Sequence, residues 1–387
     1  MPVSRRHFLL GSLSLPLFAG KAAPERPNIL LILVDELPAW VLGAYGNKEF
    51  RTPNLDRLAQ TGTRFFRHFS CAPAPGPGCA TLLSGRTPMQ LGDAPAASPA
   101  ESPLAKMLAG LGYACQGAAV TAALPLLEQQ AAGKPFFLAL NHTIGYEGAP
   151  QKYLDLYAKE KFDGYNPEHA AANAVQKEML ADVVGNVRKV AAAVSAVDDT
   201  VAALVATLRQ RSLLDSTLVI FTSACGALLG RHGLWGSSLA SQPPNMYDEA
   251  VATPMIWSWP GHVPAQGVRP EMVSAYDLVP TLCELLAAAP PAGNLCGRSY
   301  GPLVTGKPLP KKHPWRTTVC AHIDDTDMAR EERYKLVLRA QGMGPNELYD
   351  LSADERENVN QYDNQRYLTV RNTLAGELSK WQQQFSA

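Results

Sequence analysis

The stretch RPNILLILVDE, residues 26–36, decides the fold class. It contains a continuous apolar run that ends at two carboxylates, Asp35 and Glu36. A run of this kind predicts a β-strand that is buried on both faces. Such a strand belongs to a sheet that helices cover on either side. The stretch therefore favours an α/β protein.

Other parts of the chain follow the same plan. KPFFLALNH (134–142) and STLVIFTS (216–223) predict two more buried strands. TPNLDRLAQTG (52–62) predicts a helix with Thr52 as its cap, and apolar residues at helical spacing predict another from 187 to 208. Strands that alternate with amphipathic helices indicate a mostly parallel sheet, sandwiched by helices.

The two ends of the chain differ from this pattern. Residues 1–23 combine Arg5-Arg6, an apolar stretch and small residues, which predicts a twin-arginine (Tat) signal peptide. We therefore expect a bacterial protein exported in folded form to the periplasm or beyond. Residues 24–310 form the predicted α/β domain. Residues 311–387 predict a smaller subdomain with short antiparallel strands and a terminal helix over 363–385.

Composition excludes several classes of function. The 387 residues include 35 basic and 35 acidic ones, so net charge gives no reason to expect nucleic acid as a partner. No internal apolar run approaches the roughly 20 residues of a transmembrane span. The seven cysteines are an odd number, so at least one of them cannot pair within a monomer, and their spacing fits no zinc pattern. A protein that folds in the cytosol should not depend on disulfides, and any pairing after export stays open.

Candidate site residues follow the three predicted strands. Asp35-Glu36, Asn141-His142 and Ala224-Cys225 stand at the strand ends, and CAPAPGPGCATLLSGR (71–86) forms a tight loop before a helix. In a parallel sheet, ligands bind outside the carboxyl ends of the strands. These residues should therefore line one pocket. The alternative is that the polar residues only begin loops.

The chain resembles the sulfatase family, within the alkaline phosphatase superfamily. The resemblance covers nearly all of the mature chain, in family order, and implies that fold. It rests on RPNILLILVDE, GNKEFRTPNLDRLAQTGTRF, CATLLSGRTP, AVDDTVAALVATL, LLDSTLVIFTS, GRHGLWG, YDEAVATPMIWSWPG, YDLVPTLCELL and RYKLV with NELYDLSADERE.

The resemblance also identifies the position of the nucleophile. Sulfatases have a C-x-P-x-R motif before this helix; its first residue is oxidised to formylglycine and its Arg holds that group in place. Aligned without gaps, the motif falls on PGPGC, with Pro75 at the nucleophile, Pro77 retained and Cys79 at the arginine. Proline has no side-chain heteroatom, so it cannot act as the nucleophile. A thiol also lacks the guanidinium charge and its donors.

The family's metal ligands are reduced in the same way. The resemblance implies a divalent cation, usually calcium, held by two acidic residues after the first strand and an Asp with Asn or His after the FTS strand. Asp35 and Glu36 supply the first pair, whereas Ala224 and Cys225 occupy the second. Calcium takes about six to eight oxygen ligands, so its affinity should collapse.

The family's cationic residues are missing as well. Its Gly-Lys-Trp-His segment falls near QGAAVTA (116–122), its Pro-His on Gly145-Tyr146, and its Lys on Ser237. His232 matches a family position, and its role is as consistent with structure as with catalysis. The residues that bind sulfate and protonate the leaving group in the family are therefore absent at these positions.

Two alternatives keep a reactive thiol. Cys71-Ala72-Pro73 satisfies the first three places of C-x-P-x-R, so Cys71 is the fallback nucleophile, although this needs a four-residue insertion. Cys79 or Cys225 could also act as thiolates, but no neighbouring cation in the sequence would lower a thiol pKa. Our own hypothesis is that Pro75, Cys79, Ala224 and Cys225 line an apolar, uncharged pocket, beside Pro77 and His232.

The sequence thus predicts an exported member of the sulfatase family that has lost sulfate-ester hydrolysis, a pseudoenzyme without a cofactor. It would act as a non-catalytic binding or assembly protein for an unknown protein or glycan partner. The alternative is a sulfuric ester hydrolase or related phosphoesterase with displaced catalytic residues, which would need calcium. The sequence leaves the partner and the oligomeric state open.

Overall fold

The computed structural model describes residues 26–92, 98–130, 133–144, 149–165, 169–309, 312 and 314–386. The predicted signal peptide at 1–23 lies outside the described residues. So do residues 310 and 311, where the boundary between the two predicted domains falls.

The centre of the fold is a seven-stranded sheet with the order β3-β4-β1-β5-β6-β2-β7. Neighbouring strands are parallel except that β6 runs antiparallel to both β5 and β2. The mostly parallel sheet predicted from the sequence is confirmed. The strands are β1 (Asn28–Glu36), β2 (Thr63–Phe69), β3 (Ala114–Ala119), β4 (Phe136–His142), β5 (Thr217–Cys225), β6 (Met255–Ser258) and β7 (Gly267–Ser274).

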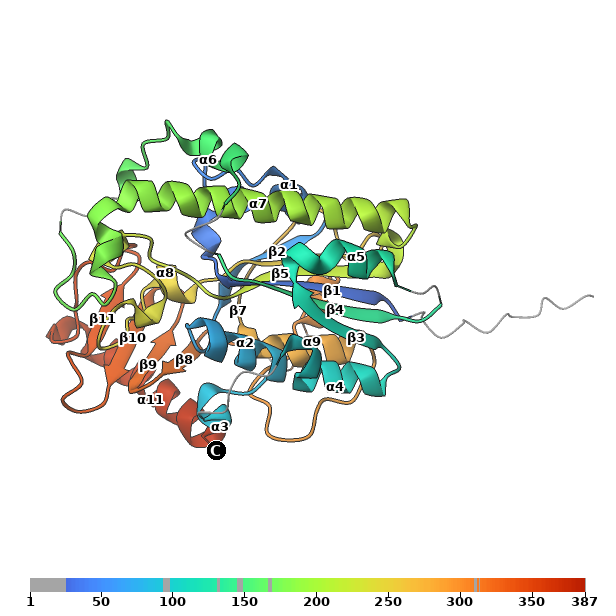
Figure 1. Cartoon of the computed structure of the whole chain (residues 1–387). Coiled ribbons are helices and arrows are strands. Elements are labelled where there is room, and N and C mark those ends of the chain that lie inside the picture. The colour runs from blue at the N-terminus through green and yellow to red at the C-terminus, as the bar shows by residue number, and fades with distance from the viewer. Residues whose placement is uncertain are drawn as a thin grey trace, which may run out of the picture.

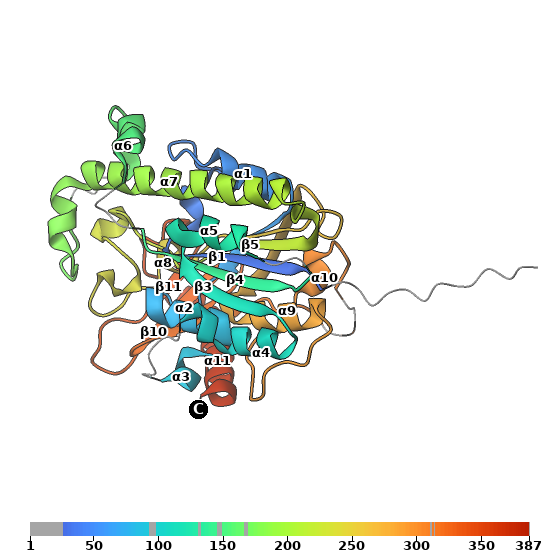
Figure 2. The same ribbon diagram turned by 45° about the vertical axis from the view of Figure 1, so that its right-hand side comes forward.

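Helices cover both faces of this sheet (Figure 1). The long helix α7 crosses one face together with α1 and α5, while α2, α4 and α9 cover the other, as a second view also shows (Figure 2). The helices are α1 (Pro53–Gln60), α2 (Pro75–Ser84), α3 (Pro88–Leu91), α4 (Pro103–Gly110), α5 (Ala123–Glu128), α6 (Gln151–Tyr157), α7 (Val183–Gln210), α8 (Asp248–Val251), α9 (Leu278–Leu285), α10 (Gly301–Val304) and α11 (Leu368–Phe385).

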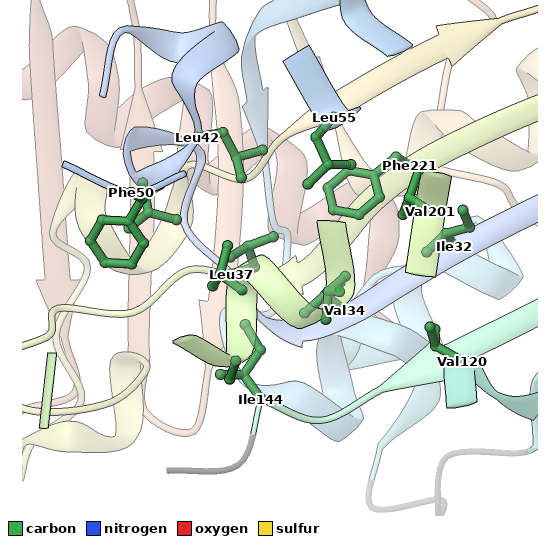
Figure 3. Close-up of a cluster of buried hydrophobic side chains, with 14 of the residues drawn as sticks. Ile32, Val34, Leu37, Leu42, Phe50, Leu55, Val120, Ile144, Val201 and Phe221 are labelled. Carbon is green, nitrogen blue, oxygen red and sulfur yellow. The ribbon is translucent and has the colours of Figure 1, made fainter. Parts of the chain in front are cut away.

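Strand β1 is buried on both faces, as its apolar run predicts. Ile32 and Val34 point into the core beneath α7, where they lie near Phe221 of β5 and Val201 of α7 (Figure 3). The alternate residues Ile29 and the leucines at 31 and 33 belong to the core on the opposite face. The apolar side chains on both faces of the strand are thus removed from water.

Thr52 occupies the N-cap position of α1, as predicted, but its side chain accepts no hydrogen bond from a backbone N–H of the first turn. Its hydroxyl instead accepts a hydrogen bond from the Gly43 backbone at 3.0 Å. The buried carboxylate of Asp198, on α7, accepts from the backbone N–H groups of Asn54 and Leu55 at 3.1 and 2.7 Å. A residue about 140 positions away therefore supplies the cap, which local sequence rules cannot detect.

One helical stretch, Lys177–Gln210, is long and apolar enough to cross a membrane by length and composition alone. It contains α7, whose apolar side chains pack on the central sheet, and 56% of its most apolar window is buried inside the fold. The described structure therefore uses it as a core helix.

A second sheet follows in the C-terminal part of the chain. It has the order β11-β10-β9-β8 and is antiparallel throughout, with α11 packed on it. This confirms the small antiparallel sheet; the strand Thr326–Arg330 was not predicted. Helix α11 begins at Leu368 rather than near 363. The strands are β8 (Val319–Ile323), β9 (Thr326–Arg330), β10 (Tyr334–Arg339) and β11 (Glu347–Asp350).

A buried histidine on β2 should make the fold sensitive to acid. Burial lowers the pKa of His68 to about 3, despite a hydrogen bond with Thr253 that acts in the opposite direction. In the unfolded chain the same imidazole titrates near pH 6.5. Between these values unfolding takes up a proton, so this group makes the folded state less stable as pH falls. At about pH 5 its contribution is a loss of about 2 kcal/mol relative to neutral pH.

Urea unfolding at a series of pH values measures this effect. His68→Gln should remove that part of the pH dependence, whereas His169→Gln, at an exposed position, should leave it unchanged. An identical pH dependence in His68→Gln and in the unmodified protein would contradict the assignment.

Candidate functional site

The three predicted strand ends meet at one edge of the central sheet. Strands β4 and β5 flank β1, with Val34 paired to His142 and Glu36 paired to Cys225. Asp35 stands between these two rungs. The Cys225 thiol donates to the backbone carbonyl of Asp35 at 3.1 Å. The residues that the sequence analysis assigned to a common site are therefore neighbours in the structure.

Helix α2 packs directly against the end of β5. The helix begins at Pro75, the position that aligns with the family nucleophile. A Cβ atom on Gly78 would lie 2.3 Å from the carbonyl oxygen of Ala224, so only glycine fits at this contact. Ser70 also donates to that carbonyl oxygen, at 2.6 Å. The start of α2 is thus held against the strand end where the second pair of family ligands would stand.

This packing bears on our hypothesis of an apolar, uncharged pocket, which stays a prediction. Ala224 and Cys225 are fully buried, and Cys79 is 7% exposed. Pro75, Cys79, Ala224 and Cys225 do not line the cavities of about 870, 710 and 450 Å³ that occur among the described residues. Helix α2 approaches β5 closely enough to bury these residues.

Thiols at this edge are poor nucleophiles. Burial, and to a lesser extent Asp35, raises the pKa of Cys79 to about 12. Burial also raises the pKa of Cys225, and both Glu36 and Asp35 act in the same direction. A thiol reacts as its thiolate, and these surroundings favour the protonated form. Pro77 is exposed on the outer side of α2, and Pro75 is half-buried.

Two side chains at the end of β4, His142 and Thr143, interact with Asp35. Thr143 donates a hydrogen bond from its hydroxyl to the Asp35 carboxylate, a contact that no family motif had pointed to. Burial lowers the pKa of His142, while Asp35 acts in the opposite direction. Asp35 therefore has a polar neighbourhood of one hydroxyl and one imidazole. The aligned Gly145-Tyr146 lies outside the described residues.

The described residues do not fit the calcium ion that the family resemblance implies. Asp35 and Glu36 offer carboxylate oxygens, but the positions of the other ligands hold a methyl group, a thiol and a proline ring. Calcium is bound by oxygens, about six to eight of them. Across the described ranges, no group of three or more His, Cys, Asp or Glu side chains could hold a metal ion. We therefore derive no chemical step through a metal.

The fallback nucleophile Cys71 lies in different surroundings. It is fully buried in the apolar cluster beneath α11, together with Cys296 and Cys320. Its backbone carbonyl accepts from His322 of β8 at 2.9 Å, which ties this segment to the second sheet. Burial raises the pKa of Cys71, and the two neighbouring thiols raise it further. The structure thus places Cys71 with other cysteines rather than with Asp35.

His232 takes part in a structural cluster. Its ring stacks on Tyr247 with 3.7 Å between centroids, and its Nε2 lies 3.4 Å from a carboxylate oxygen of Glu249. Arg231 contacts the same carboxylate at 3.2 Å and lies over the ring of Trp40. These contacts account for the histidine without a catalytic role. Ser237, at the position of the family lysine, is buried and holds no charge.

Chemical modification can test whether any thiol is activated. All seven cysteines are free, and burial raises the pKa of each one. Under native conditions at mildly alkaline pH, iodoacetamide should modify the half-buried Cys115 first and leave Cys71, Cys79 and Cys225 unmodified.

Peptide mass spectrometry over a time course measures this order, and urea-unfolded protein serves as the control in which all seven react. Rapid native-state modification of Cys79 or Cys225 would contradict the account, because it requires an activated thiolate.

The fold and site together define an α/β protein with two carboxylates, Asp35 and Glu36, at the carboxyl end of a central parallel strand. Comparison with known proteins gives the family. The sequence profile of the family named Sulfatase matches residues 27–118 and 115–288. A second profile, N-sulphoglucosamine sulphohydrolase, C-terminal, matches residues 242–384. The chain belongs to the sulfatase family.

Individual relatives agree with this assignment. Arylsulfatase A of Homo sapiens is 28% identical over 437 residues, covering 90% of this chain and 86% of the relative. N-acetylgalactosamine-6-sulfatase of Sus scrofa is 27% identical, with 75% of this chain and 67% of the relative covered.

Solved structures confirm the fold. A protein solved in complex with its substrate D-glucosamine-2-N,6-O-disulfate superposes with a TM-score of 0.77 at 19% identity, covering 93% of this chain and 98% of that one. A phosphonate monoester hydrolase of Agrobacterium radiobacter gives a TM-score of 0.74 at 21% identity, covering 93% and 96%. At these identities the likeness concerns the fold alone.

Proposed function

We propose that this member of the sulfatase family does not hydrolyse sulfate esters at the family site and acts as a non-catalytic binding or assembly protein. The observation that carries the proposal is the contact between α2 and β5. Pro75 begins the helix, and Gly78 is packed against the Ala224 carbonyl. A nucleophile and a cation-binding pair would have to stand on the two sides of this contact.

Several further features support the same proposal. Cys79 replaces the arginine and is nearly buried, Cys225 donates to a backbone carbonyl, and His232 is engaged by Glu249 and Tyr247. Sulfate transfer needs positive charge around the sulfuryl oxygens as negative charge develops. The aligned positions of the family cations hold neutral side chains here. The retained residues, Asp35 and Glu36, are themselves negative.

The rest of the proposal concerns where and how the protein acts. The twin-arginine stretch at the start of the sequence supports export of the folded chain to the periplasm or cell exterior. The nearly complete fold, with two packed sheets, supports a role as a scaffold for a protein or glycan partner.

A second candidate is a sulfuric ester hydrolase or phosphoesterase with displaced residues. One observation favours it: Asp35 keeps a polar neighbourhood of Thr143 and His142 at the sheet edge. In that case Cys71 is the cysteine available for oxidation to formylglycine. Its position beneath α11 argues against this role.

Turnover of para-nitrophenyl sulfate and para-nitrophenyl phosphate, with and without added calcium, tests the proposal. The protein should be produced in cells that convert sulfatase cysteines to formylglycine, and the mass of the Cys71 peptide should be measured in the same preparation. We expect no turnover above the buffer rate and an unmodified thiol. Turnover that Asp35→Asn abolishes, or an aldehyde at Cys71, would overturn the proposal and favour the hydrolase.

A further inference from the structure

A large cavity lies away from the family site. Its volume is about 870 Å³, and α1, α7 and the loop that follows β6 form its walls. It therefore opens where β2 and β5 begin, at the sheet edge opposite to Asp35. This volume is within the range of pockets that hold small organic molecules, about 300–1,000 Å³.

Each of the two helices presents one regular face to the cavity. On α1, lining residues recur three and four positions apart, with Leu58 between polar neighbours. On α7, Val201, Val205 and Arg209 recur every four residues along the same side. Together with Val263 from the loop, the valines and Leu58 form an apolar wall. The cavity lining thus combines apolar side chains from both helices and the loop with polar side chains.

The charged groups of the cavity have a single sign. Arg57 and Arg209 are part of the lining, which contains no Asp or Glu. Neither guanidinium forms an ion pair with a residue in the described ranges. Both arginines stand in the last turn of their helices, where the helix dipole favours a positive charge. This interaction with the helix dipole uses none of the N–H donors of the two guanidinium groups, so these donors can still bind an acceptor.

We propose that this cavity is a binding site for a small organic anion with an apolar ring system. The rings lie against the wall formed by Leu58, Val201, Val205 and Val263, and a sulfonate, sulfate or carboxylate group accepts hydrogen bonds from Arg57 and Arg209. The planar donors of arginine match the oxygens of such a group. This site is separate from the family site, so its occupancy does not depend on whether the protein hydrolyses esters.

Binding of anilinonaphthalenesulfonate, measured by fluorescence titration of the full-length folded protein, tests the proposal. The double variant Arg57→Gln/Arg209→Gln should raise its Kd by at least about tenfold, because charge-assisted hydrogen bonds are lost. The neutral dye N-phenylnaphthylamine, which has the same rings without the sulfonate, should bind the variant and the unmodified protein equally. Ala202→Trp, which places a large side chain from α7 in the cavity, should weaken the binding of both dyes.

A matched control separates this site from general charge effects. Arg356→Gln/Arg366→Gln removes two exposed arginines far along the chain and should leave the Kd unchanged. Thermal unfolding of each variant verifies that it is folded. Equal Kd values in the two double variants would overturn the proposal, as would dye binding that a folded Ala202→Trp variant retains in full. If Ala202→Trp does not fold, the comparison of the two double variants decides alone.

Discussion

Replacing Gly78 by alanine should destabilise the folded protein by about 3 kcal/mol, at the upper end of the usual range for an overfilled contact. The added Cβ would lie 2.3 Å from the Ala224 carbonyl oxygen and 2.9 Å from that of Ala72. Both obstacles are backbone atoms, so neither can rotate away. Either α2 must move from the end of β5 or the strand end must distort. Urea unfolding measures the loss of stability.

Gly76 provides the matched control on the same helix. A Cβ there meets nothing within 4 Å, so Gly76→Ala should be neutral or stabilising by up to about 1 kcal/mol. The difference between the two variants isolates the contact with β5 from helix propensity. Equal stabilities would mean that α2 is not packed against Ala224, and the argument that the family site is closed would lose its main support.

Replacing Lys335 by methionine should destabilise the protein by about 3–5 kcal/mol, the usual cost of removing one partner from a buried ionic cluster. The Lys335 side chain is fully buried on β10. Its ammonium group lies 2.5 Å from Asp248 and 2.6 Å from Glu357, and donates to the Met246 carbonyl at 2.8 Å. The cluster connects the second sheet to the segment that leads into α8.

The pKa values in this cluster show how the charges depend on one another. Burial raises the pKa of Asp248, but Lys335 and Arg330 outweigh it and hold that pKa well below its usual range. Burial raises the pKa of Glu357 to about 8, although Lys335 acts in the opposite direction. Without the ammonium group, Asp248 keeps only Arg330 as a cationic partner, and the Met246 carbonyl loses its donor.

An exposed ion pair serves as the control for this prediction. Lys380 lies 2.9 Å from Glu377, with 73% and 46% of their side chains exposed. Lys380→Met should change stability by no more than about 0.5 kcal/mol. Urea unfolding of both variants compares them directly. Similar small effects in the two would show that Lys335 is not part of the buried framework.

The sequence predicted those parts of the fold that depend on local patterns. The apolar runs of β1, β4 and β5 indicate buried strands rather than buried helix segments because they are short and contain β-branched or aromatic residues. Strand β3, with the sequence ACQGAA, has no such pattern, and its place in the sheet comes from pairing with β4. The cap of α1 by Asp198 likewise depends on the packing of α7 and has no local signal.

The sequence predicts which residues come together at the site, but it does not predict how closely they pack. Topology alone brings Asp35, His142 and Cys225 to one edge, because parallel strands share the direction of their ends. Whether this edge is closed depends on how near α2 approaches β5. Gly78 is the sequence feature that indicates this close approach, and its meaning is clear only once the structure is known. The association of Cys71 with Cys296 and Cys320 depends on where the second sheet packs. The cavity between α1 and α7 also arises from packing, since its two arginines are more than 150 residues apart.

Calcium titration of chelator-treated protein by calorimetry tests the central claim most directly, because it needs no knowledge of the substrate. With a methyl group, a thiol and a proline ring in place of oxygen ligands, we predict no saturable binding at up to about 1 mM calcium. The parallel titration of Asp35→Asn should be indistinguishable from that of the unmodified protein. Stoichiometric binding that Asp35→Asn removes would contradict the account, because it would show a functional family metal site.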